Sequence, residues 1–416
     1  MSRVVVVGSG AREHALAWAL SRHADVVVTP GNDGMAAHGL TVTSTPVLDL
    51  DADLVIFGPE APLVAGVADA VRAKGVAVLG PGLDGARLEA SKAYMKEFLQ
   101  AAGVPSARFV VVDNDTDAER FFASTNPPYV VKTDGLAAGK GVLVTPSLED
   151  AMSDVRAKIS GEAFGDAGRR VVLEEALDGP ECSVMVLVDG MRAWPLVPAQ
   201  DFKRVGDGDT GPNTGGMGAY CPMPGVGDDV AAVMETIVEP TLGELSRRGI
   251  DYRGVLYAGV MLSSRGPHLL EYNVRFGDPE TEVVTRLYEE DLFRLLDDCA
   301  RGQLTRAPEP GPGAAVAVVL AARGYPDSPE FGDVIEGLGE DGQLRDPVEG
   351  VVVFHAGTRR DSEGRFVTHG GRVLALSAHA DSLAQARELA YRAVEQVQFP
   401  GRVVRHDIAH HVKETQ

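Results

Sequence analysis

The first hundred residues alternate short apolar runs with segments of helical periodicity, and this alternation limits the possible folds more than any other feature of the sequence. Between residues 57 and 76, Leu63, Val67 and Val71 recur at helical spacing. Four apolar runs have the length and composition of buried parallel strands: residues 4–7, 26–28, 54–57 and 76–79. The alternation predicts a doubly wound α/β domain over residues 1–102.

Each predicted strand runs into a turn rich in glycine, proline or asparagine. In doubly wound sheets the ligand crevice lies at the carboxyl ends of the strands, so these turns should line a binding site. The first turn, residues 8–10, opens a helix whose free amides favour phosphate. Glu13 stands where the dinucleotide fingerprint needs its third glycine, and Thr29-Pro30 follow the second strand where an acidic ribose partner is expected. A phosphate-bearing substrate is favoured over NAD.

The pattern changes after residue 102. A helix over residues 91–102 begins at a capping serine and ends before Gly103. Glycine-punctuated strands of antiparallel α+β character then dominate, up to a turn-rich linker at 307–313. Strands at 314–320 and 351–355 and a helix near the end predict a last α+β domain. We therefore expect domains at 1–102, 103–310 and 311–416, with a lid subdomain at about 119–185.

Composition excludes several classes of protein. The 416 residues carry a net charge of −21, which would repel a nucleic-acid backbone. An apolar stretch at 314–322, among the longest, is far shorter than the roughly 20 residues that a membrane helix needs. Three cysteines without metal-ligand spacing argue against a disulfide framework. We expect a cytoplasmic protein that binds neither nucleic acid nor membrane.

The segment 268–276 is read as a strand whose side chains alternate between two faces. Leu270, Tyr272, Val274 and Phe276 then face the core, while Glu271, Asn273 and Arg275 form a polar row. Magnesium binds through few protein oxygens plus substrate phosphates, which suits Glu271 and Asn273. Arg275 could hold an anionic group beside the metal. A solvated edge is the alternative, and the acidic turn at 276–280 weighs against it.

Residues 130–144 form a second candidate segment. Glycines at 135, 139 and 141 free the backbone to curl around phosphate, and Lys132 and Lys140 supply positive charge. The spacing is not that of a Walker A loop, because Gly141 stands where Ser or Thr should hold magnesium. The segment predicts a phosphate lid, although such hairpins are often only structural.

Two further segments are suggestive. Residues 171–177 predict a strand leading into an acidic turn that could contact adenine and ribose. Residues 200–220 have no regular periodicity, and loops of that length in compact domains are usually functional or disordered. Asp207 and Asp209 fail the EF-hand pattern because Gly211 stands at the third ligand position. We interpret this segment as a loop that closes over substrate.

Taken together and in this order, the five segments resemble the phosphoribosylamine-glycine ligase family of the ATP-grasp superfamily. The most specific stretches are residues 132–141, 200–220 and 273–280. The resemblance implies a central ATP-grasp domain with antiparallel sheets, and ligation of glycine to 5-phosphoribosylamine through glycyl phosphate. It also implies that the products are ADP, phosphate and glycinamide ribonucleotide, in a step of purine biosynthesis. One departure is Ala11, where the family commonly has a second consecutive glycine.

The resemblance also assigns roles by position. Magnesium or manganese would lie on Glu271 and Asn273, and glycine would be positioned by Arg275, Asp201 and Asp278. ATP would be held by Lys92, Lys132, Gly139, Lys140, Gly141, Glu174, Glu175, Leu177 and Glu181. The phosphoribosylamine side would use Gly10, Arg12, Asn32, Pro59, Glu60, Asn213 and Gly216. The implied partners are these small molecules alone, in a monomer or homodimer.

Three rival functions stay open from the sequence. Another ATP-grasp ligase could join a different acid or amine. A nicotinamide oxidoreductase is opposed by Glu13 at the fingerprint position. A nucleotide-sensing regulator without turnover is opposed by the combined row of Glu271, Asn273 and Arg275.

Overall fold

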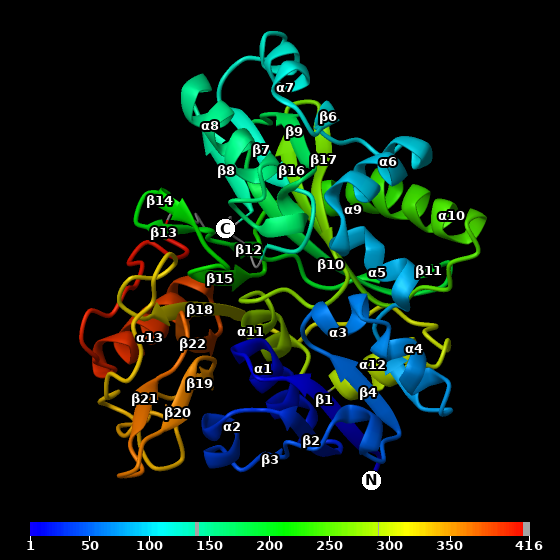
Figure 1. The fold of residues 1–416 in the computed structure, drawn as a ribbon. Helices are drawn as coiled ribbons and strands as arrows, with labels where there is room; N and C mark the ends of the chain where they lie inside the picture. Colours follow the sequence, from blue (N-terminus) through cyan, green and yellow to red (C-terminus); the bar gives the residue numbers. More distant parts are fainter. Residues whose placement is uncertain (138–140, 290, 411–416) are drawn as a thin grey trace.

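The N-terminal region is a parallel sheet, as predicted. A computed structural model describes residues 1–137, 141–289 and 291–410 (Figure 1). The strands lie in the order β3-β2-β1-β4-β5, and every pairing between them is parallel. Their bounds are β1 (Arg3–Gly8), β2 (Asp25–Pro30), β3 (Thr41–Val42), β4 (Leu54–Phe57) and β5 (Ala77–Leu79).

Both faces of this sheet are buried, because successive valines of β1 point to opposite sides. Val4 and Val6 join one apolar cluster, and Val5 and Val7 join another. The first cluster contains residues of α1 (Ala11–Leu20) and α12 (Leu292–Ala300), and the second contains residues of α3 (Ala61–Val64) and α4 (Val67–Arg72). Three more helices belong to this region: α2 (Asp33–Ala37), α5 (Leu83–Ala90) and α6 (Lys92–Ala102).

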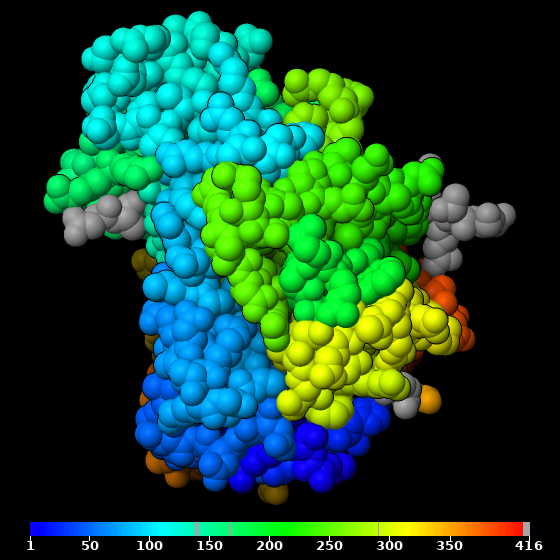
Figure 2. All heavy atoms as spheres, turned by 90° about the vertical axis from the view of Figure 1, so that its right-hand side faces the viewer, coloured from blue at the N-terminus to red at the C-terminus, as the bar shows by residue number. Residues whose placement is uncertain are grey.

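Two antiparallel sheets follow. The first has the order β6-β9-β7-β8, with α7 (Asp115–Phe122) and α8 (Leu148–Ile159) beside it, and projects from the body of the molecule (Figures 1 and 2). Its strands are β6 (Phe109–Val112), β7 (Tyr129–Thr133), β8 (Val142–Thr145) and β9 (Val171–Glu175). The second has the order β11-β10-β16-β17, from β10 (Glu181–Asp189), β11 (Arg192–Pro195), β16 (Arg253–Ser263) and β17 (Gly266–Asn273).

A third antiparallel sheet, in the order β12-β15-β18-β22-β19, joins the middle of the chain to its C-terminal part. Helix α13 (Leu383–Gln396) packs on β18 and β22. The strands are β12 (Gln200–Asp201), β15 (Gly218–Cys221), β18 (Ala314–Ala321), β19 (Val351–His355) and β22 (Arg372–Ala380). Apart from short 3-10 helices, the other elements are β13 (Arg204–Gly206), β14 (Thr210–Asn213), α9 (Gly227–Val233), the π-helix η3 (Met234–Val238), α10 (Glu239–Arg247), α11 (Thr281–Val284), β20 (Thr358–Arg360) and β21 (Phe366–Thr368).

The structure corrects the interpretation of residues 200–220 as an irregular loop. Strands β13 and β14 pair as a short hairpin within it. The tip of that hairpin is fixed to the segment 405–407, because Arg405 Nη1 lies 2.7 Å from Asp209 Oδ1 and the Gly208 amide donates to Asp407 Oδ2 at 2.8 Å. Periodicity failed to predict these strands because they are short and glycine-rich.

A second correction concerns Leu270. A β-bulge opposite Gly259 and Val260 shifts the register of β17, so Leu269 is buried in the core and Leu270 lines a cavity. The alternation holds from Glu271 onward, with Tyr272 and Phe276 buried as predicted. Among the described residues, no helix is long and apolar enough to span a membrane.

Candidate active site

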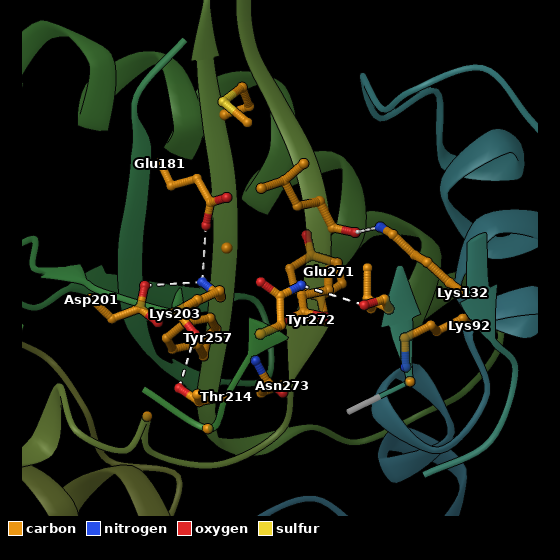
Figure 3. Close-up of a pocket in the computed structure, with 18 of the residues that line it drawn as sticks. Lys92, Lys132, Glu181, Asp201, Lys203, Thr214, Tyr257, Glu271, Tyr272 and Asn273 are labelled. Atoms are coloured by element: carbon orange, nitrogen blue, oxygen red, sulfur yellow. Dashed lines mark hydrogen bonds and ion pairs between the residues drawn. The ribbon is translucent and has the colours of Figure 1, made fainter. Parts of the chain in front are cut away.

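A cavity of about 810 Å³ lies where the three antiparallel sheets meet, and most of the residues singled out from the sequence line it. In Figure 3, Lys92 and Lys132 approach from one side and Glu181, Asp201 and Lys203 from the other, with Glu271 and Asn273 between them. The predicted residues on its wall are Arg12, Pro59, Glu60, Lys92, Lys132, Gly141, Glu174, Glu175, Leu177, Glu181, Asp201, Asn213, Glu271, Asn273, Arg275 and Asp278.

Three predicted substrate residues are not part of the cavity wall. Gly216 is buried behind it, and Gly10 caps α1, where its amide donates to Glu13 Oε2 at 2.6 Å. Asn32 uses its amide group structurally, since Nδ2 donates to the carbonyls of Ser9 and His355 at 2.9 and 3.0 Å. Gly139 and Lys140 lie outside the described residues.

Glu271 and Asn273 lie on β17 as the alternation predicts, but the strand ends at Asn273 and not at Phe276, so Arg275 faces the cavity from the bend that follows. Tyr272 is 2% exposed, and its hydroxyl lies in the core, 2.8 Å from that of Thr241. Glu271 and Asn273 face the cavity instead. Burial alone would raise the pKa of Glu271, but the charges of Lys92 and Lys203 lower it, so the carboxylate is ionised.

Arg275 is held by two carboxylates from the N-terminal region. Its Nη2 lies 2.9 Å from Glu89 Oε1, and its Nε lies 3.4 Å from Glu60 Oε2. Burial alone would lower the pKa of Arg275, but Glu89 and Glu60 raise it. Glu89 is anchored in turn, because the Val274 amide donates to its Oε2 at 2.7 Å. The guanidinium is therefore fixed in place beside Asn273, to whose Oδ1 it donates at 3.2 Å.

On the opposite side, two lysines share one buried carboxylate. Lys132 Nζ lies 2.9 Å from Glu174 Oε1, and Lys96 Nζ lies 3.2 Å from Glu174 Oε2. Glu174 is 2% exposed, so this carboxylate is engaged within the wall. Burial lowers the pKa of Lys96 to about 8, although Glu174 opposes that shift. The cluster holds more positive than negative charge, as a phosphate site requires.

The third group is acidic. Lys203 Nζ lies 2.9 Å from Asp201 Oδ1 and 3.0 Å from Glu181 Oε2. Burial raises the pKa of Asp201 to about 7, while Lys203 lowers it and Glu280 adds to the rise. Glu280 is itself fixed, because its Oε1 accepts from the hydroxyls of Ser183 and Tyr257, both at 2.8 Å. This side of the cavity suits a cationic group.

The donor set at Glu271 and Asn273 fits a divalent cation that prefers hard oxygens. An ionised carboxylate and a carboxamide oxygen stand two residues apart on one strand face. Among the described residues, no cluster of three or more His, Cys, Asp or Glu side chains could enclose a metal ion. The pair therefore suits an ion whose other ligands come from a bound phosphate or from water.

The sequence interpretation missed four residues that shape the cavity or its walls: Glu89, Lys96, Lys203 and Arg372. Only Lys203 carried a usable signal, because it follows Asp201 by two residues on a segment that was already a candidate. The others act through contacts between segments far apart in the chain, such as that of Glu89 with Arg275.

Comparisons with known proteins agree along the whole chain. Family models of phosphoribosylglycinamide synthetase match residues 2–89 (N domain), 90–281 (ATP-grasp A domain) and 315–411 (C domain). A phosphoribosylamine-glycine ligase of Mycobacterium leprae is 46% identical, over 98% of this chain and 97% of its own. One from Streptomyces coelicolor is also 46% identical, over 98% of each.

Solved structures give the same result. The crystal structure of a phosphoribosylamine-glycine ligase from Thermotoga maritima superposes with a TM-score of 0.87 at 38% identity, covering 98% of this chain and all of that one. The biotin carboxylase domain of Hydrogenobacter thermophilus 2-oxoglutarate carboxylase, solved with MgADP and bicarbonate, gives 0.73 at 17% identity, covering 97% and 91%. That second likeness concerns the fold alone.

Proposed function

The chain belongs to the phosphoribosylglycinamide synthetase family, and we propose that it joins glycine to 5-phosphoribosylamine with ATP as the energy source. The glycine carboxylate attacks the γ-phosphorus of ATP, the bond to ADP breaks, and glycyl phosphate forms. The amine of phosphoribosylamine then attacks the acyl carbon, phosphate leaves, and the nitrogen loses a proton. The product is glycinamide ribonucleotide.

The observation that carries this proposal is the separation of charge across the cavity. Lys92 and Lys132 line one side, with Lys96 buried behind them against Glu174, and the acidic group around Asp201 and Glu280 lines the other. Transfer of a phosphoryl group depends mainly on positioning and charge neutralisation, so it needs such cations and no catalytic triad. A separate acidic region provides for a substrate that carries an ammonium group.

Lys92 and Lys132 are the proposed contacts of the ATP phosphates. Lys92 begins α6, and its backbone amide donates to the Asp134 carbonyl at 2.9 Å. That bond ties the helix to the hairpin of β7 and β8. Glu175, Leu177 and Glu181 lie along the next wall of the cavity, in reach of a nucleoside. Lys140 and Gly139 complete the proposed lid by the family resemblance.

Arg275, Asp201 and Asp278 are the proposed glycine site. Arg275 is fixed by Glu89 and Glu60 and would accept the substrate carboxylate by bidentate bonding. Asp201 and Asp278 would face the ammonium. Arg12 and Glu60 line the part of the cavity nearest the N-terminal sheet, where phosphoribosylamine would enter. Holding both reactants in one cavity converts the second step into an intramolecular one.

Glu271 and Asn273 would hold magnesium or manganese. Bound there, the ion would neutralise phosphate charge and orient the γ-phosphate toward the glycine carboxylate. The protein's own part is to keep Glu271 ionised through the nearby lysines and to keep water out once the lid closes.

Substrate dependence tests the proposal. ADP release is measured with ATP and magnesium, with glycine and phosphoribosylamine supplied singly and together, and with alanine, serine and bicarbonate as alternative acids. Sustained ADP release is expected only with glycine and phosphoribosylamine together. Equal turnover with another acid, or turnover without the amine, would reject this substrate pair while leaving the ATP site intact.

A further inference from the structure

Arg372 extends the C-terminal part of the chain into the cavity. It begins β22, and its side chain lines the wall beside Asp278. Nη2 lies 2.9 Å from Asp278 Oδ2, and Nη1 donates to the Asp278 carbonyl at 3.0 Å. Arg372 therefore binds both the side chain and the backbone of Asp278, which is one of the proposed glycine contacts.

The same guanidinium holds the turn before β15. Nη1 also donates to the Gly215 carbonyl at 2.7 Å, and the Gly215 amide donates to the hydroxyl of Tyr325 at 3.0 Å. A Cβ at Gly215 would lie 3.1 Å from Arg372 Cζ. The C-terminal part of the chain thus fixes this turn through two side chains.

Gly216 shows how closely the turn and the Asp278 segment pack. Its φ of +111° is a conformation that other residues rarely adopt, and a Cβ there would lie 2.4 Å from Pro279 Cδ. Gly216 was predicted as a substrate contact. Its buried position gives it instead a packing role, in which it lets the turn lie against Asp278 and Pro279.

Behind this contact lies Glu282, which is fully buried and whose two carboxyl oxygens have no hydrogen-bond partner within the described part of the chain. Burial and the charge of Asp278 raise its pKa well above the usual range. Among the described residues Glu282 forms no ion pair with Arg372, whose carboxylate partner is Asp278. Arg372 engages Asp278 Oδ2, and no hydrogen bond or ion pair to Asp278 Oδ1 is found in the ranges that the structure describes.

We propose that Arg372 is a positioning residue for the amino-acid substrate, which orients Asp278 so that its free oxygen faces the ammonium group. The inference rests on the proposed function, because it takes glycine as that substrate. Through Arg372, the C-terminal part of the chain would help to form the glycine site. If the contacts of Arg372 only stabilised the fold, removing them would leave the affinity for glycine unchanged.

The test compares Arg372→Ala, Arg372→Lys and Arg402→Ala with the wild type. Arg402 is the matched control, because its Nη1 also donates to backbone carbonyls, including that of Val394 at 2.7 Å, but it does not line the cavity. The KM values for glycine, ATP and phosphoribosylamine are measured separately, with melting temperatures for each variant.

For Arg372→Ala, the KM for glycine should rise by about tenfold or more, and the KM for ATP should stay within about twofold. For Arg372→Lys, the KM for glycine should lie between those of the wild type and Arg372→Ala. An ammonium group can pair with Asp278 but cannot make the several hydrogen bonds of the guanidinium at once. Arg402→Ala should keep all three KM values. If Arg372→Ala does not fold, Arg372→Lys is judged by the same criterion.

Three results would overturn the inference alone: an unchanged KM for glycine, an equal rise in the KM for ATP, or a rise confined to phosphoribosylamine. A wild-type enzyme that releases ADP without needing glycine would be a different failure. It would reject the proposed function, and the inference with it.

Discussion

The two sides of the cavity are built with opposite charge arrangements. On the nucleotide side, Lys96 and Lys132 share the single carboxylate of Glu174. On the substrate side, Glu60 and Glu89 share the single guanidinium of Arg275. In the first group two cations meet one carboxylate, and in the second two carboxylates meet one cation. The comparison teaches that the two groups have opposite charge balance, which fits the proposed roles of phosphate binding for the first and substrate binding for the second.

Lys132→Ala gives the largest change in ligand binding that this comparison predicts. A lost charge-assisted contact costs about 2–3 kcal/mol, so the Kd for ATP should rise roughly 100-fold. Calorimetric titration with ATP measures it. Lys158→Ala is the control, because Lys158 is also buried and paired, with Asp154 on α8, but does not line the cavity. An unchanged Kd in the Lys132 variant would contradict the nucleotide assignment.

Glu89→Gln disturbs the substrate side without removing the side chain's volume. Glutamine can still accept from the Val274 amide, but Arg275 loses one of its two charged partners. The KM for glycine should rise about tenfold with little change in the KM for ATP. Glu244→Gln is matched to it, since Glu244 is a buried glutamate paired with Arg247 and Arg248 on α10. A rise in both KM values would remove the distinction between the two sides.

The smallest predicted effect is a pH dependence of glycine binding. Burial raises the pKa of Asp201 to about 7, so its carboxylate is ionised above that pH and protonated below it. Because an ammonium group needs the ionised form, the KM for glycine should fall as pH rises through 7 and level off above it. At pH 6 the rise should be about tenfold. In Asp201→Asn the KM for glycine should be higher and should no longer change with pH near 7. If the pH dependence persists in this variant, it belongs to another group.

The sequence could predict what depends on local pattern. Alternation along the strand places Glu271 and Asn273 on one face because neighbouring residues of a strand face opposite ways, and the alternation of buried and half-buried residues continues to Phe276 although β17 ends at Asn273. It could not predict the bulge that turns Leu270 toward the cavity, because a bulge depends on the partner strand. The ion pairs of Glu89 with Arg275 and of Arg372 with Asp278 were also hidden, since each joins residues about a hundred or more positions apart. Asn32 shows the reverse case, in which a residue assigned by resemblance has its amide engaged in structural contacts.

Glu271→Ala tests the central claim most directly, because Glu271 stands between the two sides as the proposed metal ligand. ADP formation dependent on glycine and phosphoribosylamine is measured across a magnesium titration, with circular dichroism to confirm folding and Glu244→Gln as the control. The account predicts a loss of activity of about 1,000-fold, comparable with the loss of a catalytic electrostatic contact, that added magnesium relieves only in part. A folded Glu271→Ala variant with wild-type activity and magnesium dependence would contradict it.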